Sequence, residues 1–456
     1  MNPIHSLKIK KGLPALSENT ILRYFNFIAL YFAQGVPEGM LFFGIPAWMA
    51  MNGKSAGEIA GFAIACGLPW SFKFIVAPMM DRYTILSMGR KRPWVIFGQL
   101  GLMTSFIIMA FIPDPLNNLN QLMIAGFVVS FFGSFQDVAT DSMAVDIIPV
   151  QEQARANGFM WGSKIIGISS SLSLGSWLLN KYNFTISISM LSVFIGIIML
   201  VPIFLKERPG EKTMPWTQGK ASPESKKMQL TNWNTIFNSL YKVFRLKNSL
   251  LMATIGFISL GSINYMDVLL PIFTVKALGW TNLTYSQFFA TASVIGGISG
   301  MLIGGILIDK FGKKRMMNIY FSCIICSTVT FVSLKSYWAN YYFIYSFMVV
   351  YVILNVFATI GIFAFAMQCC WKKVSASQFT LYMTICNLGR IALAALIGPV
   401  RAHFNWEISL LGYPIFILII FILFQFLNLE SHTKSIEHLE NREFETEVIK
   451  LSVIRN

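Results

Sequence analysis

Charged side chains are scarce in this chain. Asp, Glu, Lys and Arg make up 12% of the 456 residues, whereas hydrophobic residues make up 55%. This composition excludes a string of soluble domains, which is what the length alone would suggest. Apolar runs of about 20 residues, each long enough to cross the hydrocarbon core as a helix, recur along the whole length. The composition therefore indicates an all-α membrane protein with many spans.

Histidine and cysteine are also rare. None of the four His residues lies deep in an apolar run, so the commonest general base and metal ligand is missing from the membrane interior. Cys323 and Cys326 form a C-x-x-C with no further Cys and no His nearby, which is more typical of packing thiols than of a metal or redox site. We therefore expect no metal and no cofactor. One class of function to consider is an integral-membrane enzyme such as an acyltransferase. It would need a cluster of nucleophile and base that the chain lacks.

A cleavable signal sequence is not recognisable either. The first 20 or so residues are polar, and they contain no short apolar core followed by a small-residue cleavage site. We expect the first apolar span to act as its own insertion signal.

Charge, Gly and Pro interrupt the apolar runs and define twelve predicted spans in two groups of six. The expected domains are an N-terminal six-helix bundle (1–205), a basic cytoplasmic linker (206–248), a C-terminal six-helix bundle (249–428) and a cytoplasmic tail (429–456). The predicted spans lie near 22–49, 56–80, 94–112, 119–148, 156–180, 184–205, 249–275, 283–308, 316–337, 341–369, 376–399 and 407–428.

Basic residues are distributed unevenly about these spans. Of the 36 Lys and Arg residues, 28 fall on the side that holds both chain ends and the linker, 5 fall on the opposite side, and 3 fall inside spans. Because basic loops stay in the cytoplasm, both termini are predicted to be cytoplasmic. The net charge of +15 is then a topology signal that also faces anionic lipid, and no nucleic-acid partner is expected.

The two halves carry matching charges. Three charged positions of the first half recur in the second at offsets of 228, 229 and 226 residues. In that order the pairs are Asp81 with Asp309, Glu38 with Asp267, and Lys164 with Arg390. A duplicated six-helix unit, with a binding site between the halves near mid-membrane, is the architecture that this predicts.

The segment GGILIDKFGKKR, residues 304–315, resembles the loop signature G-x-x-x-D-(R/K)-x-G-(R/K)-(R/K) of the major facilitator superfamily of transporters. Its glycines allow helices to approach closely, its Asp can meet a helix N-terminus or an Arg, and its basic run stays cytoplasmic. The resemblance implies a transporter, not an enzyme, with twelve helices in two halves. The binding site between the halves would open alternately to the two sides of the membrane. The residues expected to act as gates or helix-end partners are Asp81, Arg82, Asp146, Asp309, Lys310 and Gly312.

The first half resembles a narrower branch, the peptide and acetyl-CoA transporters, whose bacterial members include the AmpG-type muropeptide permeases. The resemblance implies import of a polar or anionic solute such as an anhydromuropeptide across a bacterial inner membrane. Acetyl-CoA, another sugar or a drug stay open as alternatives. Lys164 stands where this branch is expected to carry Arg, and Glu38 occupies a place that is more often apolar. The segments are YFAQGVPEG (31–39), LPWSFKFIVAPMMDRY (68–83), GRKRPW (89–94), FQDVATDSMAVDIIP (135–149) and ARANGFMWGSKIIG (154–167).

Charged residues inside the spans are the main functional candidates. A charge at mid-bilayer costs about 2.5 to 3.5 kcal/mol on insertion scales, so such residues usually face a cavity or a partner. Four acids stand against three cations, and the surplus carboxyl could take up and release a proton, because burial disfavours its charged form. We expect proton coupling in a monomer whose partners are lipid, a small solute and protons. The acids are Glu38, Asp137, Asp141 and Asp267, and the cations are Lys73, Lys164 and Arg390.

Asp137 and Asp141 are one helical turn apart in the fourth span, so both carboxyls lie on one face. Like charges there disfavour double ionisation, and the pair is expected to titrate as a unit. The resemblance to the branch implies the same acids. The alternative is a static ion pair with Lys73 or Lys164. Asp146 lies about 180° around the helix from Asp137, near the cytoplasmic end, and is predicted to act as a gate.

The buried cations are also candidates for substrate binding, because muropeptides and acetyl-CoA are anions. Arg390, with Asn387 three residues before it on the same face, is the better candidate for a bidentate contact. Pairing between helices is the alternative. Trp70 and Trp161 could stack on a sugar ring, with lipid-facing or packing roles as the alternative. The full set predicted to bind substrate is Lys73, Lys164, Arg390, Asn387, Gln34, Trp70 and Trp161.

Overall fold

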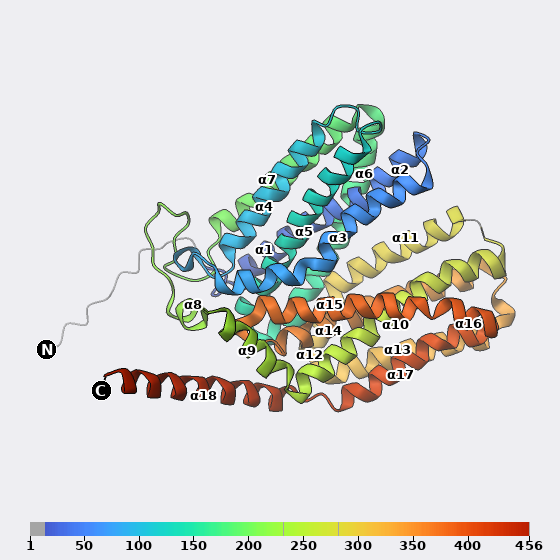
Figure 1. Cartoon of the computed structure of the whole chain (residues 1–456). Helices are drawn as coiled ribbons and strands as arrows, with labels where there is room; N and C mark the ends of the chain where they lie inside the picture. The colour runs from blue at the N-terminus through green and yellow to red at the C-terminus, as the bar shows by residue number, and fades with distance from the viewer. Residues whose placement is uncertain (1–13, 231, 281, 456) are drawn as a thin grey trace.

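Two bundles of long helices build the molecule (Figure 1). The computed structural model describes residues 14–230, 232–280 and 282–455. Residues 20–204, blue to green in the figure, form one bundle, and residues 247–425, yellow-green to red, form the other. The bundles lie against each other at the end that carries the connection between them, and they diverge toward the opposite end.

Six spanning units make up the N-terminal bundle. The first runs through three consecutive helical pieces as one continuous apolar stretch, Thr20–Met51. The other five are single helices. The pieces are α1 (Thr20–Gly39), η1 (Met40–Gly44), α2 (Ile45–Met51), α3 (Ala56–Arg82), α4 (Arg92–Ala110), α5 (Leu119–Ile147), α6 (Gln153–Lys181) and α7 (Phe184–Phe204).

The C-terminal bundle has six corresponding units. Two of them are again divided into consecutive helical pieces, at Gly300–Gly304 and at Leu396. The pieces are α10 (Lys247–Leu278), α11 (Asn282–Ser299), η4 (Gly300–Gly304), α12 (Gly305–Phe311), α13 (Lys313–Ser333), α14 (Tyr341–Gln368), α15 (Ser375–Ala395), α16 (Ile397–His403) and α17 (Trp406–Gln425).

Eleven spans in the described part of the chain are long and apolar enough to cross a bilayer. The twelfth span, α6, is as long as α5, at 29 residues, but it carries a lysine and a run of serines. Its polar residues Asn157, Ser163 and Lys164 are buried against other helices, which is why lipid does not exclude them. The predicted all-α fold with twelve spans in two halves of six is confirmed.

Local side chains define where several spans begin. The Asn183 side chain accepts a hydrogen bond from the N–H of Ile186 at 2.8 Å, at the start of α7. Ser55 and Glu58 form a reciprocal capping box at the start of α3. The first N–H groups of a helix have no partner within it, and a cap of this kind typically contributes about 1 kcal/mol. The sequence therefore fixes these helix starts locally.

Glycines bring the backbones of the two bundles into contact. A Cβ atom on Gly158 of α6 would lie 2.8 Å from the carbonyl oxygen of Gly300 in η4, and one on Gly305 would collide with the Ala154 carbonyl. Gly300 belongs to a wider, π-helical turn that the sequence did not predict, and turns of this kind frequently occur at functional sites. The small residues let α6 lie directly against η4 and α12 of the other half.

Three further helices lie at the cytoplasmic end: α8 (Pro223–Met228), α9 (Trp233–Phe244) and α18 (Leu429–Arg455). Trp371, in the loop before α15, is fully buried and packs with Ile236 of α9 and Ile436 of α18. Its indole N–H donates a hydrogen bond to Glu440 Oε1 of α18 at 2.8 Å. The segments expected as a linker and a tail are thus joined through one buried tryptophan.

Glu207 ties the linker to the N-terminal bundle. Its carboxylate accepts hydrogen bonds from the backbone N–H groups of residues 90–92, at 2.9 Å for Arg90, where α4 begins. A negative charge stabilises a helix at that end. The buried Glu211 lies close by and accepts a hydrogen bond from the N–H of Arg208 at 3.0 Å. Burial, together with the neighbouring Glu207, raises the pKa of Glu211 to about 8.

The raised pKa of Glu211 makes the linker sensitive to pH. The folded chain holds this proton up to about pH 8, whereas the group ordinarily loses it near 4.5. The folded state therefore binds more protons between these values, and the stability present below pH 4.5 is lost as the pH rises through about 8. Glu211→Gln should reduce the fall in unfolding temperature between pH 5 and pH 8.5. Glu224→Gln on the exposed face of α8 is the control, and equal pH profiles for both variants would contradict the assignment.

Candidate functional site

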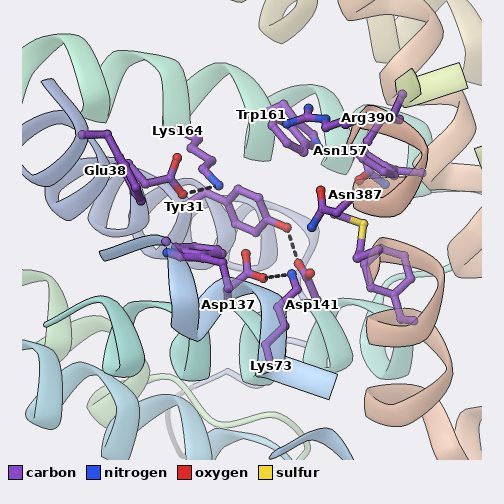
Figure 2. A pocket seen from close by; sticks show the side chains of 17 residues that line it. Tyr31, Glu38, Lys73, Asp137, Asp141, Asn157, Trp161, Lys164, Asn387 and Arg390 are labelled. Atoms are coloured by element: carbon purple, nitrogen blue, oxygen red, sulfur yellow. Dashed lines mark hydrogen bonds and ion pairs between the residues drawn. The ribbon is translucent and has the colours of Figure 1, made fainter. Parts of the chain in front are cut away.

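A cavity of about 280 Å³ lies between the two bundles. Helices α1, α3, α5 and α6 line it from the N-terminal half, and α10, α14 and α15 line it from the other half. Figure 2 shows charged side chains pointing into it from the first set of helices, with Asn387 and Arg390 approaching from α15. Most of the charges predicted inside the spans therefore face a cavity and not lipid.

The two acids of α5 have different surroundings. Asp137 Oδ2 lies 2.8 Å from Lys73 Nζ, and both side chains are buried. Asp141 is 3% exposed and accepts a hydrogen bond from the Tyr31 hydroxyl. No Lys or Arg nitrogen in the described part of the chain lies within 4.0 Å of the Asp141 carboxylate. The structure thus gives Asp137 a counter-charge and Asp141 only a neutral donor (Figure 2).

Lys164 lies between a carboxylate and two indole rings. Its Nζ is 2.6 Å from Glu38 Oε1 and 5.3 Å from the ring centroids of both Trp70 and Trp161. A cation over a tryptophan face is attracted by the negative face of the ring. Both rings line the cavity, and Trp161 also packs on Phe363, with their ring centroids 5.2 Å apart.

A second cavity of about 310 Å³ adjoins the first and shares Trp161, Leu260 and Arg390 with it. Asp267 faces this second cavity, where its Oδ1 accepts a hydrogen bond from the Tyr351 hydroxyl at 2.8 Å. The described residues place no carboxylate within 4.0 Å of the Arg390 guanidinium. Ion pairs therefore account for only some of the charged residues inside the spans.

Two polar residues that the sequence did not single out also line the first cavity. Tyr31 precedes Glu38 by seven residues, and Asn157 precedes Lys164 by seven. Seven residues are two helical turns, so each lies on the same face as the charge that follows it, and the spacing could have indicated both. Gln34, in contrast, lines neither cavity; it is buried, and its amide has no hydrogen-bond partner among the described residues.

Asp81 joins the cytoplasmic end of α3 to the start of α15 in the other half. It accepts hydrogen bonds from the backbone N–H of Ser377 at 2.9 Å and from its hydroxyl at 2.7 Å. A carboxylate in this position compensates the free N–H groups and the dipole of the helix. Lys91 Nζ lies 2.6 Å from Asp81. Burial lowers the pKa of Lys91, and the negative charge of Asp81 opposes that effect.

Arg90 is the second buried link between the halves. Its guanidinium lies 2.9 Å from Asp146 Oδ2 and donates to the carbonyl oxygens of Lys372 and Lys373, just before α15. Arg90 is completely buried, and Asp146 is 3% exposed. Asp146 therefore lies at the cytoplasmic contact between the halves, and the sequence had not singled out its partner Arg90.

Asp309 repeats the arrangement of Asp81 in part. It accepts a hydrogen bond from the backbone N–H of Arg155 at 3.2 Å, at the start of α6, and the Arg155 side-chain Nε lies 3.5 Å away. The contact of α12 with α6 thus mirrors that of α3 with α15. Gly312 turns the chain between α12 and α13 with φ of 92°, a conformation that favours glycine.

Two basic residues of the signature loops, Arg82 and Lys310, lie beside aromatic rings. Arg82 is placed over the rings of Tyr83 and Trp233, at 4.9 and 4.8 Å from their centroids. Lys310 is exposed, 5.5 Å from the ring centroid of Phe311. In the described part of the chain, no three His, Cys, Asp or Glu residues are grouped so that they could hold a metal ion.

Known proteins resemble this chain in sequence and in fold. It is 25% identical over 398 residues to the anhydromuropeptide permease of Escherichia coli strain K12, an alignment that covers 86% of this chain and 75% of that protein. Its fold is similar to the crystal structure of the Escherichia coli fucose:proton symporter FucP, with a TM-score of 0.66 at 12% identity, covering 90% and 99% of the two chains. A bacterial homologue of the iron transporter ferroportin in an outward-facing state gives a TM-score of 0.62 at 10% identity, covering 88% and 98%.

The family is shown by a match over most of both halves. Residues 27–394 match the family model described as the Major Facilitator Superfamily. The expectation of a multi-pass integral membrane protein that transports a solute and is not an enzyme is thereby confirmed. This chain belongs to the major facilitator superfamily.

Proposed function

We propose that this transporter imports a muropeptide together with protons, by alternating access across a bacterial inner membrane. The observation that carries the proposal is the cavity between the halves. It brings Asp141, a buried carboxyl with no Lys or Arg nitrogen of the described residues within 4.0 Å, beside two buried lysines and two indole rings.

Sugar and anion recognition are the features that favour a muropeptide. Trp70 and Trp161 offer apolar ring faces of the kind that can pack on a sugar ring, and Lys73 and Lys164 offer positive charge to a carboxylate. The relative named as an anhydromuropeptide permease supports the same class of substrate. A sugar acid carrying a peptide would use both kinds of contact at once.

We assign the proton to Asp141. Asp137 and Glu38 each hold a lysine at 2.8 and 2.6 Å, so neutralising either would leave a buried ammonium without its partner. Among the described residues Asp141 has only the Tyr31 hydroxyl as a hydrogen-bond partner, and its neutral, protonated form is compatible with burial. A proton moved inward through a potential of about 100 mV supplies about 2.3 kcal/mol, enough for roughly 50-fold accumulation of solute.

Alternating access would use the contacts at the cytoplasmic end. Asp81 and Asp309 each hold a helix start of the opposite half, and Arg90 adds a further link between the halves. For a solute to leave the cavity toward the cytoplasm these contacts have to separate. Their separation would be balanced by new contacts on the opposite side of the membrane.

Uptake by the purified protein in proteoliposomes tests this function. With an imposed pH gradient, acid outside, anhydromuropeptide should accumulate several-fold above its external concentration, and collapsing the gradient with an ionophore should abolish the accumulation. Acetyl-CoA and a simple sugar should neither accumulate nor compete at equal concentration.

The comparison of solutes decides between the alternatives. Accumulation of acetyl-CoA in preference to anhydromuropeptide would overturn the substrate assignment. Muropeptide uptake that is indifferent to the gradient would overturn the coupling. Protein-free liposomes measure passive leakage and set the background for both readings.

A further inference from the structure

The second cavity contains opposite charges that do not meet. Asp267 on α10 and Arg390 on α15 both line it. Within the described part of the chain, neither has an oppositely charged side chain within 4.0 Å. An ionised group in a membrane span normally faces a partner, so two opposite charges in one cavity without contact require an explanation.

The corresponding two side chains in the other half are in contact. By the offsets between the repeats, Glu38 matches Asp267 and Lys164 matches Arg390. Glu38 and Lys164 lie 2.6 Å apart in the first cavity. The two halves thus hold equivalent charges on equivalent helices, in contact on one side of the molecule and apart on the other.

Wider separation of helices α10 and α15 does not explain why Asp267 and Arg390 are not in contact. Gly389, next to Arg390, lies so close to α10 that a Cβ atom there would collide with the Phe257 carbonyl. Gly35 meets the Lys164 carbonyl in the same way on α1 and α6. Asn264 also donates a hydrogen bond to the backbone carbonyl of Arg390 at 3.1 Å. The backbones of α10 and α15 are therefore in contact, and only the side chains of Asp267 and Arg390 stay apart.

The rest of this cavity suits the part of a ligand between two charges. Phe289, Val352 and Val356 give it an apolar wall, while Tyr351 holds Asp267 Oδ1. No hydrogen bond from the described residues reaches Asp267 Oδ2, which leaves that oxygen for a ligand. At about 30 Å³ for each water-sized group, 310 Å³ leaves room for about ten such groups, more than the five heavy atoms of an amino-acid ammonium, α-carbon and carboxylate.

We propose that this cavity binds the amino-acid end of the peptide part of the substrate, with its ammonium group on Asp267 and its carboxylate on Arg390. The assignment rests on the proposed transport of a glycopeptide. Trp161 and Arg390 belong to both cavities, so one molecule can place its sugar in the first and its peptide end in the second. The planar guanidinium of Arg390 is suited to a carboxylate because it donates two parallel hydrogen bonds.

Binding to the purified full-length protein tests the site through paired changes in protein and ligand. The probes are an anhydromuropeptide whose peptide carries a free ammonium beside a carboxylate, the same molecule acetylated on that amine, and the disaccharide without peptide. Acetylation should weaken binding to the unaltered protein at least about tenfold, which corresponds to about 1.4 kcal/mol. In Asp267→Asn the free and acetylated molecules should bind equally, and the disaccharide should bind as it does to the unaltered protein.

Matched changes extend the test. Converting the peptide carboxylate to an amide should weaken binding to the unaltered protein but have little effect in Arg390→Gln. Asp114→Asn is the control, because it makes the same acid-to-amide change at an exposed loop position outside both cavities. Equal weakening of all three ligands by Asp267→Asn, or no effect of acetylation on the unaltered protein, would overturn the proposal and indicate a structural role for the acid.

Two further controls, the disaccharide and the peptide part of the anhydromuropeptide alone (as a tripeptide), separate this inference from the proposed function. If the disaccharide binds but the acetylated and free glycopeptides bind alike, the second cavity is not the peptide site, while muropeptide transport stands. If the sugar ligands do not bind but the tripeptide binds in an Asp267-dependent way, the cavity assignment stands and the muropeptide assignment falls. If no ligand binds, both are overturned.

Discussion

Asp141→Asn is expected to abolish the solute accumulation that a pH gradient drives, reducing it from several-fold to the level of equilibration. The amide keeps the size of the side chain and its contact with Tyr31 but cannot exchange a proton. Loss of the coupled proton removes about 1.4 kcal/mol for each pH unit of the gradient, which is roughly a tenfold ratio of concentrations. Gradient-driven uptake in proteoliposomes is the measurement.

Exchange of solute without a gradient provides the internal control for Asp141→Asn. If Asp141 serves coupling alone, the variant should still exchange internal for external solute, because the cavity and its lysine pairs are unchanged. Asp141→Glu, which keeps a carboxyl, should retain part of the accumulation, and Tyr31→Phe should retain it at a shifted pH optimum. Full accumulation by Asp141→Asn would show that another group carries the proton.

Asp81→Asn is expected to shift the transporter strongly away from the conformation with its cytoplasmic end closed. The carboxylate is completely buried and serves both Lys91 and the start of α15, so its loss leaves the buried Lys91 ammonium without its counter-charge. Removing one member of a buried pair costs about 3 kcal/mol or more, equivalent to roughly a 100-fold change in the ratio of closed to open molecules. Uptake and release of the substrate should then no longer depend on the opening and closing of the cytoplasmic end.

Cys370 offers a native reporter of that opening. It is buried at the cytoplasmic contact, where burial raises its thiol pKa well above the ordinary value and the nearby acid Asp146 adds to the effect. Alkylation of Cys370, followed by mass spectrometry, should accelerate in Asp81→Asn, while the exposed-loop variant Asp114→Asn leaves its rate unchanged. Asp309→Asn should give a smaller acceleration, because Arg155 is 39% exposed and keeps its hydration. Unchanged protection of Cys370 in Asp81→Asn would contradict the gating role.

Much of the candidate site could be predicted from sequence because a charge in a span needs a cavity or a partner. Lys73, Lys164, Asp137 and Asp141 were predicted on that ground, and all four line one cavity. Hydropathy could not predict Tyr31, because a tyrosine in a span is also typical of packing. Its role depends on a carboxyl 110 residues away, which only packing brings to it.

The cytoplasmic contacts show the same division. Asp81 and Asp309 were predicted from a recurring loop signature, and each lies at a helix start of the opposite half. The basic partners were not predictable from that signature. Arg90 turns inward to Asp146 and to carbonyls of the other half, whereas Arg82 turns outward onto aromatic rings.

The sequence by itself determined the spans, their orientation and the duplication, because these follow from local hydropathy, from the side on which basic loops lie and from a nearly constant offset between charges. Only the tertiary structure decided that, among the described residues, Asp137 has a lysine within 4.0 Å and Asp141 has none, and that Glu38 meets Lys164 while Asp267 stays apart from Arg390. The physical reason is that distances between side chains on different helices depend on how each helix is rotated and packed. Charge interactions change steeply over those few ångströms.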